Sequence, residues 1–174
     1  FIIGHTLEES LFQLMHLDLR GELKVKRLEN VGNIVPELCL VYKQLHTLGL
    51  SWGNDNEGNF DPRSSRWIAE GYHSCNMENV LSCLQPNRNL KSLALHGYLG
   101  VMFPQWMNNV MLPNLTKIAL INCRKCENIP ALGQLPFLKV LYMRGMDAVV
   151  KIGGEIYGKE ARRRPFPSLI ELTM

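Results

Sequence analysis

The sequence lacks the features that mark several large functional classes. No apolar run reaches the ~18 residues that a bilayer-spanning helix needs. No basic segment followed by an apolar one stands at the start, so no signal peptide is visible. The phosphate-loop pattern G-x-x-x-x-G-K-[ST] does not occur, and neither do the hydrolase patterns G-x-S-x-G and H-E-x-x-H. We therefore expect a protein that is not an enzyme, needs no cofactor and has no membrane span.

The chain also carries little net charge and few cysteines. Its formal charge of +3, from 19 basic and 16 acidic residues, is too small to imply binding of nucleic acid. A basic run at 159–164 precedes Pro165, which favours a solvated loop over a phosphate-binding patch. The five cysteines are an odd number and are scattered, which suits a reducing compartment. These features predict a cytoplasmic location.

Two short motifs have a chemical and a structural interpretation. Cys123 and Cys126 have the spacing of a zinc knuckle or a redox pair, but no second pair of ligands accompanies them. We interpret both as core residues. The stretch FPQWM at 103–107 is either an exposed aromatic patch or an apolar plug at the edge of the fold, and we favour the plug. Neither motif predicts a reactive or metal site.

Leucine is what the sequence has in excess, with 27 leucines against four aspartates. The leucines recur in the frame Leu-x-x-Leu-x-Leu, in which Ile or Met replaces some of them. The frame begins at Leu45, Leu90, Leu115, Leu138 and Leu169, and a partial copy begins at Arg20. The frame also fits 14–19, but the partial copy at 20–25 keeps a spacing of 25 residues to the next copy and is preferred.

The spacing of these copies identifies a repeat. The middle apolar positions are Leu23, Leu48, Leu93, Ile118, Leu141 and Leu172. Three of the five steps between them, 25, 25 and 23 residues, fall within the period of about 20–29 residues of leucine-rich repeats. The steps of 45 and 31 residues contain stretches rich in Gly, with Asn, Asp or Pro, which favour irregular loops. We expect variable insertions near 53–75 and 153–167.

The frame predicts a solenoid. In a short strand, the second and third apolar positions point to the same side, and stacked strands join them into one core. We expect residues 1–174 to form one leucine-rich-repeat domain of about six repeats, an α/β solenoid with a horseshoe shape. A parallel sheet lines its concave face, and helices, 3₁₀ turns and loops form its convex side. Helices are expected at 35–45, with Val41 and Tyr42 on the apolar face, and at 76–86, with Asn76 as N-cap. A 3₁₀ connection is expected at 128–136.

Alternate residues of each strand should project from the concave face, the open face of the sheet. We call these positions the outward slots. They are Lys24 and Lys26, Gly49 and Ser51, Ala94 and His96, Ala119 and Ile121, and Tyr142 and Arg144. Tyr and Arg are common at interface hot spots. We therefore expect Lys24, His96, Tyr142 and Arg144 to contact a protein partner; the alternative is that each is only a solvated side chain.

Longer stretches of the sequence resemble one protein family. LKSLALHGYLGVMFPQWM (90–107), the segment 115–158 with its NIPALGQLPFLK, and FPSLIELTM (166–174) resemble the leucine-rich repeats of plant nucleotide-binding disease-resistance proteins of the coiled-coil class. The stretches at 19–31 and 48–53 are similar to earlier repeats of that domain, whereas 35–45 departs from it because a more charged helix is usual there. The resemblance covers nearly the whole chain.

This resemblance implies an intracellular immune receptor. The domain would recognise a pathogen effector or a guarded host protein, and it would hold a nucleotide-binding module of the same receptor in its inactive state. The chain begins with Phe1 and contains no phosphate loop, so we expect a fragment of the longer receptor.

Two other functions are compatible with the same solenoid. The first is the ectodomain of a cell-surface receptor, which predicts near-constant repeat lengths, several glycosylation sequons and paired capping cysteines. The chain shows none of these, since its only sequon is the N-L-T at Asn114. The second is the substrate-recruiting adaptor of a ubiquitin ligase, which an F-box-like helical segment would reveal.

Overall fold

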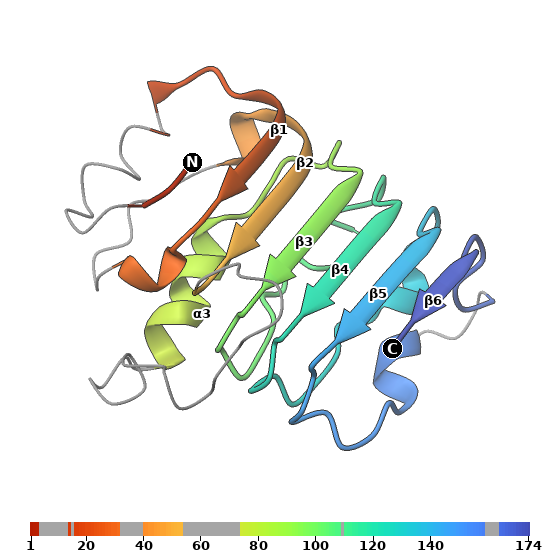
Figure 1. Cartoon of the computed structure of the whole chain (residues 1–174). Helices are drawn as coiled ribbons and strands as arrows, with labels where there is room; N and C mark the ends of the chain where they lie inside the picture. The colour runs from red at the N-terminus through yellow and green to blue at the C-terminus, as the bar shows by residue number, and fades with distance from the viewer. Residues whose placement is uncertain (4–13, 15, 32–39, 54–73, 109, 159–163) are drawn as a thin grey trace.

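The computed structural model describes residues 1–3, 14, 16–31, 40–53, 74–108, 110–158 and 164–174. These residues contain one parallel sheet whose strands follow each other in chain order, which confirms the predicted architecture (Figure 1). The strands are β1 (Arg20–Val25), β2 (Gln44–Ser51), β3 (Ser92–His96), β4 (Lys117–Ile121), β5 (Val140–Arg144) and β6 (Glu171–Thr173).

The strand register confirms the repeat frame. One row of paired residues contains Leu23, Leu48, Leu93, Ile118, Leu141 and Leu172. Two residues further on, a second row contains Val25, Leu50, Leu95, Leu120 and Met143. Both rows are buried except at the last strand, where Leu172 is 49% exposed. The two rows therefore form the continuous core that the stacking of repeats requires.

The first strand departs from the frame in one detail. The register shifts between Gly21 and Glu22, so Gly21 rather than Arg20 lies opposite Leu45. Arg20 points into solvent, where its guanidinium contacts the Asp18 carboxylate at 2.8 Å. Gly21 therefore occupies the position where the other repeats place a leucine, and Arg20 lies opposite Gln44 instead.

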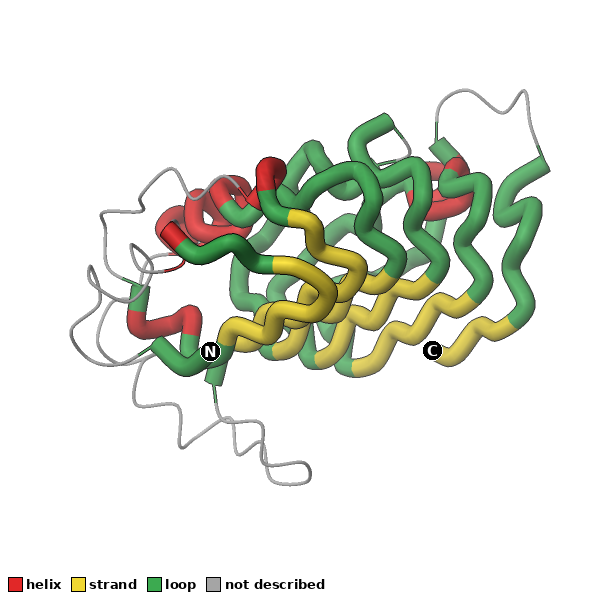
Figure 2. The backbone as a smooth tube through the Cα atoms, turned by 90° about the horizontal axis from the view of Figure 1, so that it is seen from above, coloured by secondary structure: helices red, strands yellow, loops and turns green. Residues whose placement is uncertain are grey.

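The convex side is mixed, as expected. Figure 2 shows the strands along one side of the stack and the helices and loops along the other. These elements are the helix α3 (Ser74–Cys83) and the 3₁₀ helices η1 (Leu28–Asn30), η2 (Leu40–Tyr42), η3 (Leu132–Gln134) and η4 (Gly154–Tyr157). The 3₁₀ connection expected at 128–136 is confirmed by η3. None of the helices in the described residues is long and apolar enough to span a membrane.

Two helix predictions need correction. Helix α3 begins at Ser74, so Asn76 lies inside its first turn and is not the N-cap. Of the helix expected at 35–45, residues 35–39 lie outside the described residues, and η2 is a single 3₁₀ turn that leads directly into β2. A turn of three residues is too short for an amphipathic face. Val41 and Tyr42 are accordingly 41% and 84% exposed rather than buried.

The insertions coincide only partly with described residues. Residues 54–73, most of the first expected insertion, lie outside them, as do 159–163 within the second. The described part of the second insertion contains η4, whose Ile156 is buried beside the η3 glycine Gly133. Phe166 of the same insertion also packs against the core, so the insertion contributes to it at both ends of its described part.

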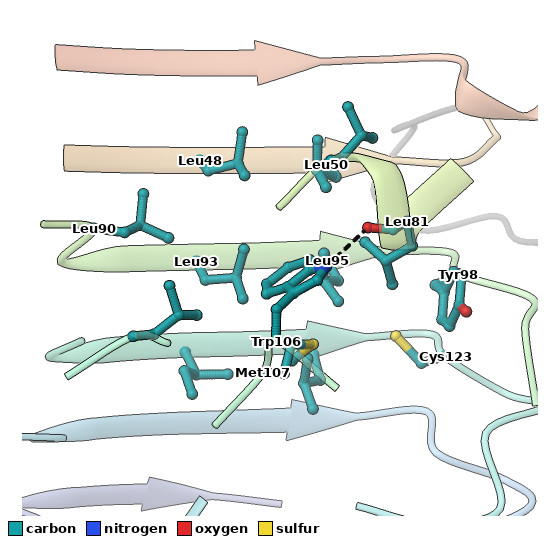
Figure 3. Packing of buried hydrophobic residues seen from close by; sticks show 14 of the residues in the cluster. Leu48, Leu50, Leu81, Leu90, Leu93, Leu95, Tyr98, Trp106, Met107 and Cys123 are labelled. Atoms are coloured by element: carbon teal, nitrogen blue, oxygen red, sulfur yellow. Dashed lines mark hydrogen bonds between the residues drawn. The ribbon is translucent and has the colours of Figure 1, made fainter. Parts of the chain in front are cut away.

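The motif FPQWM contributes to the core and is not an exposed patch. Trp106 and Met107 are 5% and 3% exposed. The indole Nε1 of Trp106 donates a hydrogen bond of 3.1 Å to the backbone oxygen of Leu81 in α3 (Figure 3). The ring of Phe103 lies 5.8 Å from that of Tyr98, which lies 5.1 Å from that of Trp52. The predicted plug is confirmed, and it holds α3 against the sheet.

A turn in the left-handed region follows three neighbouring strands. Gly97, Asn122 and Gly145 come directly after β3, β4 and β5, with φ of 70°, 55° and 66°. The backbone N–H of Gly97 donates to the oxygen of Ile121 at 2.8 Å, and that of Asn122 donates to the oxygen of Arg144 at 2.7 Å. The turns at Gly97 and Asn122 thus continue the ladder by one bond each before the chain leaves the sheet.

Candidate protein-interaction surface

The outward slots of five strands form two rows across the concave face. The first row is Lys24, Gly49, Ala94, Ala119 and Tyr142, each residue in register with the next. The second row contains Ser51, His96, Ile121 and Arg144. Adjacent strands lie about 4.8 Å apart, so the first row extends about 19 Å from Lys24 to Tyr142.

The sizes of these side chains create a hollow. Gly49, Ala94 and Ala119 occupy the middle of the first row, and the larger Lys24 and Tyr142 stand at its two ends. The concave face accordingly contains a groove of about 950 Å³ above these strands. We call it the concave groove; its lining includes Lys24, His96, Tyr142 and Arg144. The structure therefore brings the four predicted contact residues to one groove, while their role remains a prediction.

Lys24 extends over the floor of the groove. A Cβ built on Gly49 would lie 3.2 Å from the Cγ of Lys24, so the stem of the lysine covers this glycine. Its Nζ lies 2.7 Å from the Glu22 carboxylate. This hydrogen bond and the negative charge of Glu22 raise the pKa of Lys24 above its usual value. Lys24 is therefore positively charged at the edge of the groove, and its carboxylate partner is exposed to solvent.

The charged side chains that line the groove are all basic. Lys24, Lys26, Arg124 and Arg144 line it, and none of the described residues that line it is acidic. Arg124 contacts the exposed carboxylate of Asp147 at 3.3 Å, outside the lining. The lining itself therefore carries positive charge, and the carboxylates of Glu22 and Asp147 lie beside it.

Ser51 supplies a buried polar group to the same groove. It is 8% exposed, and its Oγ has no hydrogen-bond partner among the described residues. A buried hydroxyl without a partner carries an uncompensated desolvation cost. Ser51 is thus a donor that a bound group could satisfy.

Two polar residues of the groove are missing from the predicted outward slots. Asn122 and Arg124 line it although they follow β4 rather than belong to it. Arg124 lies inside the C-R-K-C motif, which was interpreted only through its cysteines. A Gly or Asn directly follows β3, β4 and β5 and adopts a positive φ. This residue type is the sequence signal for a turn at the end of the strand, and such a turn brings the residues after it to the edge of the sheet.

The two motif cysteines lie in the core, as interpreted. Cys123 and Cys126 are both fully buried, and the Cys126 thiol donates to the backbone oxygen of Gly100 at 3.1 Å. Burial raises the pKa of Cys123 to about 12 and also raises that of Cys126, so neither thiol ionises near neutral pH. The described residues contain no group of three or more side chains suited to hold a metal ion. The motif is therefore structural.

A second hollow lies on the convex side. It has a volume of about 580 Å³ between α3 and the FPQWM loop, and Glu78, Met102 and Phe103 line it. The carboxylate of Glu78 accepts hydrogen bonds from the backbone N–H groups of Val101 and Met102 at 2.8 and 3.1 Å. Glu78 thereby attaches this loop to α3, and a structural role accounts for its position.

Comparison with known proteins agrees with this architecture. A leucine-rich-repeat family described as R13L1/DRL21 LRRs matches residues 11–146. The disease resistance protein RGA2 of Solanum bulbocastanum is 32% identical over 100% of the chain and 17% of its own length. The putative disease resistance protein At3g14460 of Arabidopsis thaliana is 32% identical over 97% of the chain and 12% of its own length.

Another relative is of the same kind. The putative disease resistance RPP13-like protein 1 of Arabidopsis thaliana is 31% identical over 87% of the chain and 15% of its own length. The chain thus spans less than a fifth of each of these relatives. No solved structure matches it significantly. The chain belongs to the R13L1/DRL21 family of leucine-rich repeats, the repeat region of plant disease-resistance proteins of the coiled-coil nucleotide-binding class.

Proposed function

We propose that the chain is the interaction module of an intracellular plant immune receptor and that the concave groove is its contact surface. The module acts in the cytoplasm by binding and not by catalysis. Its partner is a pathogen effector or a host protein that the effector modifies. The observation that carries this proposal is the groove of about 950 Å³ into which the outward slots of five strands converge.

The arrangement of the groove supports this function. Repeat proteins use the extended surface of their stacked units for binding. The groove combines a tyrosine, two arginines and a histidine with a floor of small residues, and Tyr and Arg are the residues most often found at binding hot spots. The names of the relatives, all disease resistance proteins, support an immune role over a cell-surface ectodomain or a ubiquitin-ligase adaptor.

We extend the proposal to restraint of the receptor. The relatives are several times longer than this chain, which leaves room for a nucleotide-binding module in the same receptor. The repeat module would contact that module in the resting state and release it when a partner binds. For this switch to work, the nucleotide-binding module must bind the repeat module more tightly in the resting state, and the partner must bind it more tightly in the released state.

Site-specific crosslinking tests the contact surface. A photoreactive phenylalanine analogue replaces Tyr142 in the groove and, as a matched control, Val150, which is 97% exposed and does not line the groove. Both variants are expressed in leaf cells with a candidate effector or host target. We expect crosslinks to that protein from position 142 and few from position 150. Equal crosslinking from both positions, or crosslinking from 150 alone, would contradict the proposal.

A further inference from the structure

We propose that the concave groove recognises an acidic segment of its protein partner, with Lys24 and Arg144 binding carboxylate side chains at two ends of the groove. This inference rests on the proposed function of the groove as an interaction surface and adds the chemistry of the partner. It is carried by the charge of the lining, the dimensions of the floor and the buried hydroxyl of Ser51.

Basic side chains gather in this groove. Four basic side chains line it, and none of the described lining residues is acidic. Without those four, the sequence keeps 15 basic and 16 acidic residues, so the rest of the chain is close to neutral. Complementary charge steers a partner towards such a surface and disfavours partners of the same sign. The complementary partner is acidic.

The two carboxylates beside the groove show what its cations bind. Lys24 contacts the carboxylate of Glu22 at 2.7 Å, and Arg124 contacts that of Asp147 at 3.3 Å. The pair of Lys24 and Glu22 is exposed, and such pairs contribute little to stability, whereas Arg124 is half-buried. A carboxylate of a partner can therefore replace Glu22 on Lys24 at small cost. Glu22 is in this sense a weak competitor of the proposed ligand.

The floor of the groove suits an extended peptide. Gly49 and Ala94 line the floor and carry no side chain beyond Cβ, so a backbone can approach the sheet closely beside the stem of Lys24. An extended chain rises about 3.3 Å per residue, so roughly six residues cover the distance of about 19 Å from Lys24 to Tyr142. The hydroxyl of Ser51, which has no partner among the described residues, is available to donate to a carboxylate or backbone oxygen of that peptide.

The same lining disfavours nucleic acid. Proteins that bind single strands stack successive bases on several aromatic side chains along a basic groove. Among the described residues that line this groove, only Tyr142 and His96 carry aromatic rings. The formal charge of +3 also provides little electrostatic attraction for a phosphate backbone. An acidic peptide fits the groove better than an oligonucleotide does.

Fluorescence anisotropy with labelled peptides tests the proposal. The probes are an octaglutamate peptide, an octaglutamine peptide of the same length and an eight-residue oligothymidylate. We expect the chain to bind octaglutamate at low salt, to bind octaglutamine at least tenfold more weakly, and to bind octaglutamate more tightly than oligothymidylate. Tighter binding of the oligothymidylate would overturn the proposal in favour of a nucleic-acid ligand.

Charge-matched variants separate the groove from the general charge of the chain. The double variant Lys24→Glu with Arg144→Glu is compared with Lys139→Glu and Lys151→Glu, two exposed lysines that do not line the groove. Both variants have the same net charge. We expect at least a tenfold loss of octaglutamate affinity in the first and less than a threefold loss in the second. Similar losses in both would overturn the proposal.

Two milder variants test the individual contacts. Glu22→Gln removes the competing carboxylate from Lys24, so we expect octaglutamate affinity to rise about twofold to fivefold. Ser51→Ala removes the proposed donor, so we expect a loss of about threefold in octaglutamate affinity, with a melting temperature that is unchanged or higher because an unpaired buried hydroxyl is removed. Weaker binding after Glu22→Gln would contradict the assigned role of Lys24. Absence of octaglutamate binding would refute the acidic ligand and leave crosslinking from Tyr142 unaffected, so the two proposals fail separately.

Discussion

The two faces of the sheet are made by alternate residues of the same strands, yet they obey different constraints. The inner positions of β2 to β5 are all Leu, Ile or Met and are all buried. The outward slots of those strands hold Gly, Ser, Ala, His, Ile, Tyr and Arg in the same register. The comparison teaches that one face determines whether the chain folds and the other determines what it binds. Substitutions should separate the two.

The largest expected effect is on the inner face. Leu95 is fully buried between Leu50 and Leu120 in neighbouring strands. Leu95→Ala removes buried apolar volume and leaves a cavity, which lowers the free energy of unfolding by about 2–5 kcal/mol. Ala94→Ser, one residue away on the outward face, should change it by about 0.5 kcal/mol or less. Urea denaturation measures both, and comparable losses would remove the distinction between the faces.

A smaller effect on the free energy of unfolding is expected at the turns that lead from the strands to the convex side. Gly97 has a φ of 70°, and a Cβ there would collide with the backbone oxygen of Trp52. Gly97→Ala should therefore lower the free energy of unfolding by about 1–3 kcal/mol. Gly154→Ala is the matched control, because a Cβ there meets nothing within 4 Å and its φ is not in the left-handed region. A tolerated Gly97→Ala would show that this turn does not limit the stacking of repeats.

The buried thiol of Cys123 makes the inner face sensitive to alkaline pH. Burial raises its pKa to about 12, so the folded chain keeps this proton while the unfolded chain loses it above about pH 8.5. The stabilisation is complete below the unfolded pKa and is lost as the pH rises from there towards 12. Unfolding free energy should therefore fall by about 2 kcal/mol between pH 8 and pH 10 from this thiol.

A substitution isolates this contribution. Cys123→Ala removes the thiol, so the pH slope of the unfolding free energy between pH 8 and 10 should become shallower. Iodoacetamide gives a second measurement, since Cys123 should react at pH 8 only after denaturation, whereas the partly exposed Cys83 should react earlier. An unchanged slope, together with rapid alkylation of Cys123 in the folded chain, would show that this part of the core opens readily.

The inner face was predictable from the sequence, and the reason is its period. Each strand repeats two apolar positions at a fixed offset, so the sequence alone predicts the row from Leu23 to Leu172. The exceptions are positions where a local interaction overrides the period. Gly21 stands in place of the leading leucine at the register irregularity, and Val41 and Tyr42 lie in a 3₁₀ turn just before β2 rather than in an α-helix.

The groove was predictable only in part. The outward slots follow from the strands, so the positions of Lys24, His96, Tyr142 and Arg144 could be inferred. The return of Arg124 to the edge of the groove depends on the left-handed turn at Asn122, a conformation that a non-glycine residue adopts only occasionally. The hollow itself depends on the small residues Gly49 and Ala94 aligning across separate repeats, which a single strand does not reveal.

The smallest effect on stability is expected where the effect on binding should be greatest. Tyr142 and Arg144 lie on the outward face of β5, and Arg144 is exposed. Arg144→Ala removes no buried contact, so the free energy of unfolding should change by less than about 0.5 kcal/mol. The same variant should lose at least half of the crosslinking from position 142. A large loss of stability would mean that the outward face also supports the fold, and the division of labour between the two faces would then not hold for β5.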